Sequence, residues 1–183
     1  KFGKVGDGRT TTGIEYKRNH INGKTTYLIY DTPGFENLDD LLIEVQRKLK
    51  INRHPHIDEI VHHLGFDRDD KSELAYRTLD QIKDCDVVIY VIDIREPVQQ
   101  CYKDEIECLQ KSTVPLVVTF NYSKTDASDK ESWTKYLKAI GIHTFSEFDA
   151  HARTRKDENK LFEKLQILVE DDSLHEEFLK SWI

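Results

Sequence analysis

Hydrophobic and polar positions change period along the chain, and these changes divide it into strands and helices. Residues 14–21 and 24–30 alternate as strands do, and the Asn-Gly pair between them favours a two-residue hairpin turn. Residues 86–93 and 114–121 are continuous apolar runs rich in β-branched side chains. Such runs are typical of strands covered on both faces. A shorter alternating segment, 142–148, predicts one more strand.

Helical periodicity occupies the intervals between the strands. In the first helical segment Leu38, Leu41 and Leu42 share one face, and Asn37 supplies an N-cap. We expect the second helix to begin near Pro55 and to stop at Gly65, since proline suits a first turn and glycine a C-terminal cap. The predicted helical segments are 37–50, 55–65, 72–83, 97–111, 132–140 and 159–169.

A hairpin followed by alternating strands and helices predicts an α/β fold. The expected sheet is mostly parallel, with one antiparallel edge strand. Ligands of such sheets bind at the carboxyl ends of the strands. Asp31, Asn121 and Asp149 each follow a predicted strand. The pattern therefore predicts a ligand site at that edge.

Gly23-Lys24-Thr25 has the letters that end a phosphate-binding loop, but its surroundings are wrong for one. Such a loop requires a glycine five residues before the Gly-Lys pair, so that backbone N–H groups can surround the phosphates. Arg18 stands at that position, and a strand rather than a helix follows. We therefore interpret the tripeptide as part of the hairpin.

The segment Asp31-Thr32-Pro33-Gly34 suits a magnesium ion held beside a triphosphate. It is equally the composition of an ordinary turn after a strand. Upstream, Thr10, Thr11 and Thr12 lie in a glycine-containing segment. A threonine hydroxyl that binds the metal only while the γ-phosphate is present would let this loop report hydrolysis. A threonine run is also common in plain loops.

Four segments together resemble a known family. TTTGIEY, LIYDTPGFEN, CDVVIYVIDIREPV and PLVVTFN are similar to the G domain of Era/TrmE-like (TRAFAC class) GTPases, over residues 6–168. The similarity is greatest to bacterial GTPases that carry an uncharacterised C-terminal domain. It implies a Ras-like three-layer P-loop NTPase fold, binding of GTP or GDP with Mg²⁺, and slow hydrolysis coupled to a molecular switch. Residues 1–170 would form the G domain, and 171–183 would begin a C-terminal helical extension.

The resemblance assigns roles at the phosphate end of the nucleotide. Thr11 would bind the metal and act in catalysis. Thr10 or Thr12 would take this role if the family motif aligned one residue earlier or later. Asp31 would be the second metal residue, and Gly34 would donate its backbone N–H to the γ-phosphate. Phe35 stands where Ras-type enzymes place a water-orienting glutamine, so catalytic help would come from elsewhere.

The resemblance also assigns residues to the base. The family motif Asn-Lys-x-Asp is expected here, whereas the chain reads Asn121-Tyr122-Ser123-Lys124. Asn121 fits, and Lys124 with Asp126 would act as a substitute displaced by two residues. Ala150 would donate its backbone N–H to the base oxygen.

No GxxxxGK[ST] motif occurs in the 183 residues. The family places that loop just before the first switch, so we expect a strand, a phosphate loop and a helix upstream of Lys1. The strand would lie between those ending at Tyr30 and Asp93. The alternative is a nucleotide-incompetent interaction module that keeps the G-domain fold as a scaffold, which the altered base motif favours.

Composition narrows the class of partner. Hydrophobic residues make up 38% and charged residues 33%, as in a globular protein, and the net charge of −7 argues against general nucleic-acid binding. No apolar run reaches the roughly 20 residues that cross a bilayer. We expect a cytoplasmic protein whose partners are a guanine nucleotide and a protein effector or second copy at the switches. Membrane contact would come only through a further domain.

Four histidines, His54, His56, His62 and His63, lie close together beside Asp58 and Glu59. An Asp or Glu four residues before a histidine can share a zinc ion with it. No two of the histidines have that spacing, however, and the two mixed pairs point in different directions. We interpret the cluster as solvated surface.

Overall fold

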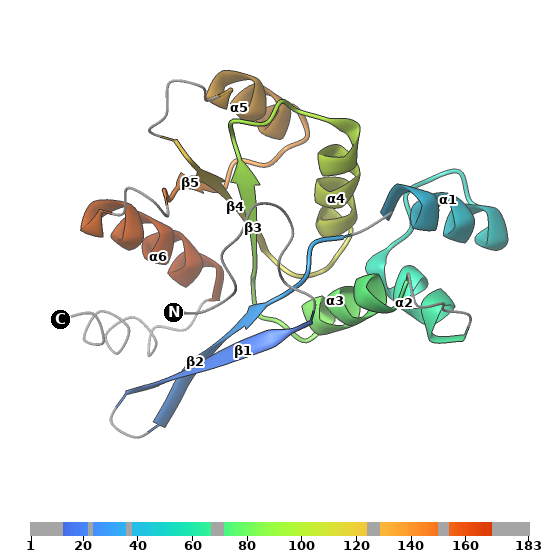
Figure 1. The fold of residues 1–183 in the computed structure, drawn as a ribbon, viewed down its shortest axis with the longest axis horizontal. Helices are drawn as coiled ribbons and strands as arrows, with labels where there is room; N and C mark the ends of the chain where they lie inside the picture. Colours follow the sequence, from blue (N-terminus) through green and yellow to red (C-terminus); the bar gives the residue numbers. More distant parts are fainter. Residues whose placement is uncertain are drawn as a thin grey trace. The chain divides into compact units, whose positions relative to one another are not determined.

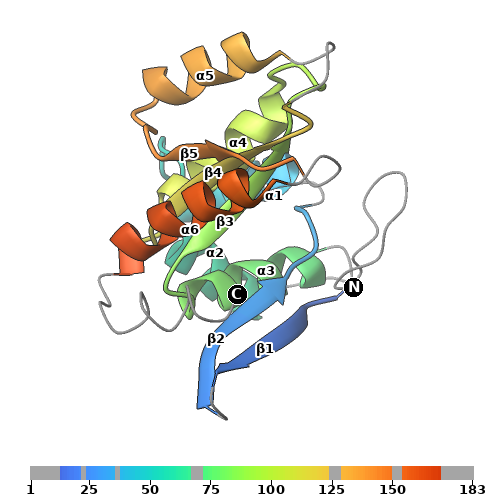
Figure 2. The same cartoon turned by 90° about the vertical axis from the view of Figure 1, so that its left-hand side faces the viewer.

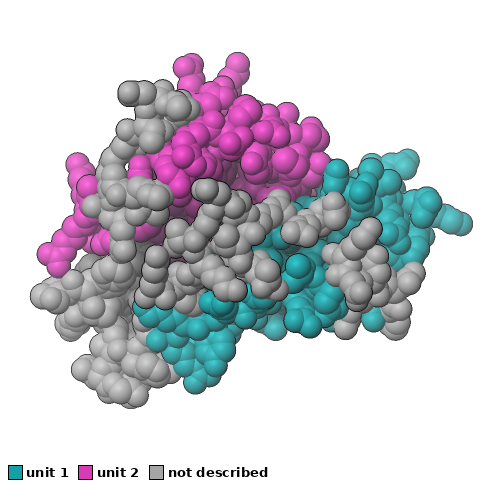
Figure 3. Space-filling view, viewed as in Figure 1, with its two compact units in different colours: residues 1–84, 171–183 teal, residues 85–170 magenta. Residues whose placement is uncertain are grey.

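The computed structural model describes residues 13–21, 24–35, 38–66, 72–123, 129–149 and 154–169. The chain divides into two compact units, shown in teal and magenta in Figure 3. One consists of Lys1–Asp84 with Asp171–Ile183, and the other of Cys85–Glu170.

The first unit contains an antiparallel hairpin (Figure 1). Strand β1, Glu15–Ile21, pairs with β2, Lys24–Asp31, and the register runs from Glu15 opposite Asp31 to Ile21 opposite Lys24. A bulge between Asn19 and His20 shifts the pairing by one residue. The predicted hairpin is therefore confirmed, and Lys24 belongs to a strand rather than to a phosphate loop.

Three helices follow the hairpin in the first unit: α1, Leu38–Leu49, α2, Ile57–Phe66, and α3, Glu73–Lys83. Helix α2 begins two residues after Pro55, near the predicted start, and continues through Gly65 to Phe66, so the predicted stop at Gly65 is wrong by one residue. Its start is fixed by Glu59, whose carboxylate accepts a hydrogen bond of 2.7 Å from the His56 N–H. This is one half of a capping box, and it outweighs the preference of proline for a first turn.

The second unit is built on a parallel sheet in the order β3-β4-β5 (Figure 2). Its strands are β3, Val88–Asp93, β4, Leu116–Asn121, and β5, Phe145–Glu147. Helices α4, Gln100–Gln110, α5, Lys130–Ala139, and α6, Arg155–Val169, alternate with them. The predicted α/β alternation and parallel pairing are thus confirmed for this unit.

Helix α6 begins four residues before the predicted start at 159. Thr154 explains the difference, because its Oγ1 accepts a hydrogen bond of 3.2 Å from the Asp157 N–H. The same hydroxyl donates to the Asp157 carboxylate at 2.6 Å. A threonine cap of this kind satisfies an N–H group that the helix itself leaves unpaired.

Burial of the two apolar runs differs. In β4 the side chains from Val117 to Phe120 are buried, as the sequence predicts. In β3, Ile89 is 41% exposed and Val91 58% exposed, so the prediction of cover on both faces is wrong for this strand. The two residues are two positions apart and so share one face of the sheet, and this face of β3 is uncovered. The described strands also form two sheets, whereas the sequence predicted one.

The core of the second unit surrounds Trp133, which is fully buried. Its indole Nε1–H donates to the carbonyl of Glu96 at 2.8 Å, and its ring lies 5.7 Å from that of Tyr102. The buried members of this core are Ile92, Ile94, Ile106, Val118, Phe120, Trp133, Leu137 and Ile142. The cluster joins β3 and β4 to α4 and α5, and so holds the carboxyl ends of the two strands in place.

Within the described residues, no helix has the length and apolar character needed to cross a membrane.

Replacing Leu137 by alanine is expected to destabilise the second unit by about 2–5 kcal/mol, because the side chain is fully buried in this core. Urea denaturation followed by tryptophan fluorescence measures the change, since Trp133 lies in the same cluster. Lys135→Ala on the exposed side of α5 is the matched control and should change stability by less than about 0.5 kcal/mol. Equal effects of the two variants would contradict the assignment of the core.

Candidate functional site

The turn after β2 carries the predicted metal and γ-phosphate residues. Asp31 is the last residue of β2, lies opposite Glu15 and is half-buried. Gly34 is exposed, whereas Pro33 before it and Phe35 after it are buried. The buried Thr78 Oγ1 donates to the Pro33 carbonyl at 3.4 Å, which ties the turn to α3. The turn is therefore anchored on both sides of Gly34 while the glycine stays accessible.

Phe35 occupies the position where Ras-type enzymes have a catalytic glutamine. Its side chain is only 6% exposed and belongs to the core of the first unit. A buried phenyl ring has no group with which to orient water. The structure thus gives this position a packing role.

The carboxyl ends of the parallel strands bring several polar residues to one edge of the second unit. Asp93 and Asn121 are a register pair at the ends of β3 and β4. Ile94 N–H donates to the Asn121 carbonyl at 3.4 Å, and Phe148 N–H donates to the Phe120 carbonyl at 3.0 Å. Asp149, 3% exposed, follows β5 on the same edge. Asn121 and Asp149 therefore come at the carboxyl ends of neighbouring parallel strands, as the sequence predicted.

Asp31 belongs to the first unit, so its position beside Asn121 remains a prediction. Four further predicted site residues lie outside the described residues: Thr11, Lys124, Asp126 and Ala150. The alternatives Thr10 and Thr12 lie outside them too. Their roles therefore remain predictions.

Arg95 is a residue at this edge that the sequence pattern did not single out. Its Nε donates to Asp93 Oδ1 at 2.9 Å and its Nη2 to Asp93 Oδ2 at 2.6 Å. The Arg95 backbone N–H also donates to Oδ1, at 3.1 Å. These hydrogen bonds lower the pKa of Asp93 and raise that of Arg95, so both groups are charged at neutral pH. The signal in the sequence was an arginine two residues after a strand-ending aspartate.

Tyr122 stands where the family motif has lysine, and its conformation is unusual. Its φ is +58°, in the left-handed region that bulky side chains rarely adopt. The Tyr122 N–H donates to Asn121 Oδ1 at 3.0 Å. The Arg95 guanidinium carbon lies 3.6 Å from the centre of the tyrosine ring. Asp93 therefore binds the edge of the Arg95 guanidinium, and a face of that guanidinium packs on Tyr122, next to Asn121 in the chain.

A parallel α/β sheet with polar residues at the carboxyl ends of its strands is the arrangement of nucleotide-binding α/β domains. A scan against family models identifies the family: the model for 50S ribosome-binding GTPases matches residues 6–122, more than half of the 183-residue chain. The chain belongs to this GTPase family, and it is a GTP-binding protein. No curated protein and no solved structure matches the chain.

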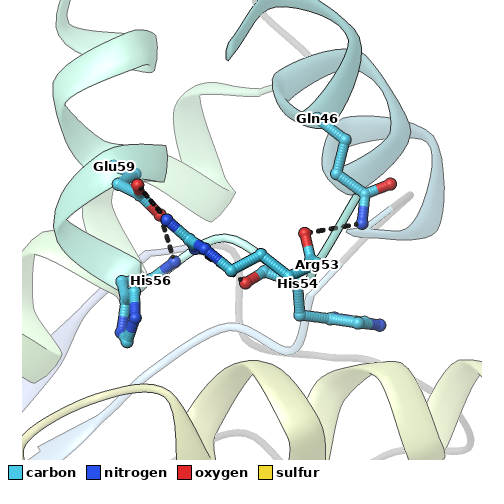
Figure 4. Close-up of polar contacts among 5 residues, drawn as sticks. All are labelled: Gln46, Arg53, His54, His56 and Glu59. Atoms are coloured by element: carbon cyan, nitrogen blue, oxygen red, sulfur yellow. Dashed lines mark hydrogen bonds and ion pairs between the residues drawn. The ribbon is translucent and has the colours of Figure 1, made fainter. Parts of the chain in front are cut away.

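The histidine-rich segment between α1 and α2 has a structural role that the sequence did not show (Figure 4). Arg53 Nη1 and Nη2 donate to the two carboxylate oxygens of Glu59, at 2.8 and 2.7 Å. The Gln46 side chain donates to the Arg53 carbonyl at 3.0 Å. The rings of His54 and His56 point in different directions (Figure 4). Within the described part of the chain, no group of three or more His, Cys, Asp or Glu residues is placed to hold a metal ion.

The pKa of Glu59 is lowered to about 2, first by the hydrogen bonds from Arg53 and then by the His56 N–H. A carboxylate whose folded-state pKa is depressed stabilises the fold above its unfolded pKa, and the contribution disappears as pH falls toward the folded value. Glu59→Gln should therefore be less stable than the parent protein at pH 6–7. The difference should shrink between about pH 4.5 and pH 2. Urea denaturation of both proteins across this range tests it.

The control for that comparison is Glu131→Gln, which removes an exposed carboxylate in the first turn of α5. A stability difference between Glu59→Gln and the parent that stays constant from pH 7 to pH 3 would show that the Arg53–Glu59 pair does not stabilise the fold.

Proposed function

We propose that the chain is the G domain of an Era/TrmE-type molecular switch that binds GTP with Mg²⁺ and hydrolyses it to GDP. The observation that carries the proposal is the family match over residues 6–122, which includes the turn after β2 and the end of β4. The polar edge of the parallel sheet, with Asn121 at its centre, supports it. These are the two places where such a domain needs residues for phosphate and for base.

Magnesium would be held at the turn after β2. Asp31 contributes a carboxylate, the ligand type that Mg²⁺ prefers, either directly or through water. Thr11 would contribute a hydroxyl to the metal while the γ-phosphate is bound, and loss of that contact would couple hydrolysis to the switch. The backbone N–H of Gly34, an exposed residue, would donate to the γ-phosphate, where negative charge accumulates in the transition state.

Hydrolysis by the full-length protein without a partner is expected to be slow. Attack on the γ-phosphate needs an oriented water molecule. The nearest side chain after the glycine is Phe35, which is buried and carries no hydrogen-bonding group. A protein effector, or a second copy of the chain bound at the switches, would supply the missing group.

The base would bind at the carboxyl edge of the second unit. Asn121, Lys124 and Asp126 would contact the guanine, and Ala150 would donate its backbone N–H to the base oxygen. Buried hydrogen-bonding groups that a wrong base leaves unpaired are what make such a site selective. Asn121 is the last residue of β4, at the edge where the base would bind.

The phosphate loop would precede Lys1, following a strand that pairs with β3. Support comes from β3 itself, which is the edge of its sheet among the described strands. A neighbouring strand would pair the backbone groups along that edge. The lysine of the loop would then neutralise phosphate charge, and residues 1–183 without it would not hydrolyse GTP.

Replacing Asp31 by asparagine is expected to weaken Mg²⁺-dependent binding of a non-hydrolysable GTP analogue by about tenfold or more, which corresponds to ~1.4 kcal/mol. Binding measured in EDTA should change little, because the lost interaction is with the metal. Isothermal titration of the full-length protein, with and without Mg²⁺, measures both. Asp39→Asn, an exposed carboxylate in the first turn of α1, is the matched control and should behave as the parent protein.

Two other results would change the conclusion. An Asp31→Asn variant that keeps its full Mg²⁺ dependence would remove Asp31 from the metal site. Failure of GTP and GDP to bind a full-length protein, shown by intact mass to contain its phosphate loop, would exclude the switch. The chain would then be an interaction module that keeps the G-domain fold as a scaffold.

A further inference from the structure

We propose that Arg95 and Tyr122 form the surface on which the purine base stacks, so that contact with the face of the base replaces part of the edge recognition that the altered motif has lost. This inference rests on the proposed nucleotide-binding function and assigns its base-binding wall. Neither residue follows the family pattern, since Tyr122 stands in place of lysine and Arg95 comes from a different strand end.

The geometry of the pair suits stacking. The Arg95 guanidinium carbon lies 3.6 Å from the centre of the Tyr122 ring, which is the distance of a close cation–π contact. Asp93 binds two edges of the guanidinium, through Nε and Nη2. Those bonds lie in the plane of the group, so one of its faces packs on Tyr122 and the other is left for the base. Asp93 therefore acts as a positioning residue that fixes how Arg95 is presented.

Both side chains are also partly accessible. The Arg95 side chain keeps 45% of its surface accessible, and Tyr122 is half-buried. A pair formed only to close the core would be covered more completely. A flat, partly exposed surface made of a guanidinium and a phenol ring is what nucleobases stack on in proteins.

The backbone conformation of Tyr122 agrees with a role in ligand binding. A φ of +58° suits glycine or asparagine far better than tyrosine. Local contacts maintain it, because Asn121 Oδ1 accepts the Tyr122 N–H and Arg95 covers the ring. Residues held in sparsely populated backbone conformations concentrate at ligand sites. The conformation thus adds to what the geometry and exposure of the pair indicate.

The pair lies where a ligand is expected. Arg95 and Tyr122 follow β3 and β4 directly, at the carboxyl ends where open α/β sheets bind their ligands. A bound ligand at this edge would therefore meet an aromatic face and a planar cation within two short segments.

The chemistry predicts how the site treats different bases. Stacking tolerates any purine, because every base presents a π-face. Loss of the stack should therefore weaken binding of GDP and ADP by a similar factor, whatever the ratio between them in the parent protein. The phosphates do not touch this surface, so binding of pyrophosphate should not depend on it.

The test is isothermal titration of the full-length protein with GDP, ADP and pyrophosphate. Arg95→Lys keeps the charge and removes the planar group, and Tyr122→Ala removes the ring. Each is expected to weaken both nucleotides by about tenfold and to leave pyrophosphate unchanged. Tyr122→Phe keeps the stacking ring and should bind within about twofold of the parent protein. Arg77→Lys is the matched control, since Arg77 is an exposed arginine paired with Glu73 at 2.7 Å.

The outcomes separate this inference from the function on which it rests. Parent protein that binds GDP, with Arg95→Lys and Tyr122→Ala binding it equally well, would overturn the stacking surface and leave the proposed function standing. Equal loss of pyrophosphate and GDP would assign the pair a purely structural role and would also overturn it. Parent protein that binds neither nucleotide would overturn both proposals. Thermal denaturation checks folding, and Arg95→Lys still decides the question should Tyr122→Ala fail to fold.

Discussion

The parallel pairing of β3 with β4 is the constraint on which the candidate base site depends. The two strands stay in register over their whole length, from Val88 opposite Leu116 to Asp93 opposite Asn121. Parallel strands need a long crossover between them, which α4 provides, and their polar ends then fall at the same edge. The core around Trp133 packs against this pair and fixes it. A slip of one residue would move Asp93 and Asn121 apart and turn every side chain to the other face.

The contacts at the carboxyl ends of β3 and β4 depend on this pairing. The Asp93 carboxylate accepts two hydrogen bonds from the Arg95 guanidinium and so fixes the orientation of that group. The Arg95 guanidinium packs on the ring of Tyr122, and the Tyr122 backbone N–H donates a hydrogen bond to the Asn121 side chain. This geometry is the basis on which we propose that the edge of the second unit binds a flat, polar ring. The turn after β2 in the first unit offers a carboxylate and an exposed glycine, which suit a metal and a phosphate.

The two units differ in how much of their structure is local. The hairpin and the start of α2 depend on residues close in sequence, such as His56 and Glu59, which form half of a capping box. In the second unit, β3 and β4 have similar apolar sequences. The side chains of β4 are buried, whereas Ile89 and Val91 of β3 are exposed, and the two strands differ in their places in the sheet. An apolar sequence therefore identifies a strand, but it does not show whether that strand lies at the centre or at the edge of its sheet.

The amino-acid sequence by itself determined the type and order of the elements, the hairpin of β1 and β2, and the position of Asn121 at the end of a parallel strand. These features follow from the spacing of apolar residues and turn formers, which acts over a few residues. Only the tertiary structure decided that Phe35 is buried and that Arg95 covers Tyr122. The physical reason is that burial and stacking depend on which distant segments pack together, and local periodicity carries no information about that.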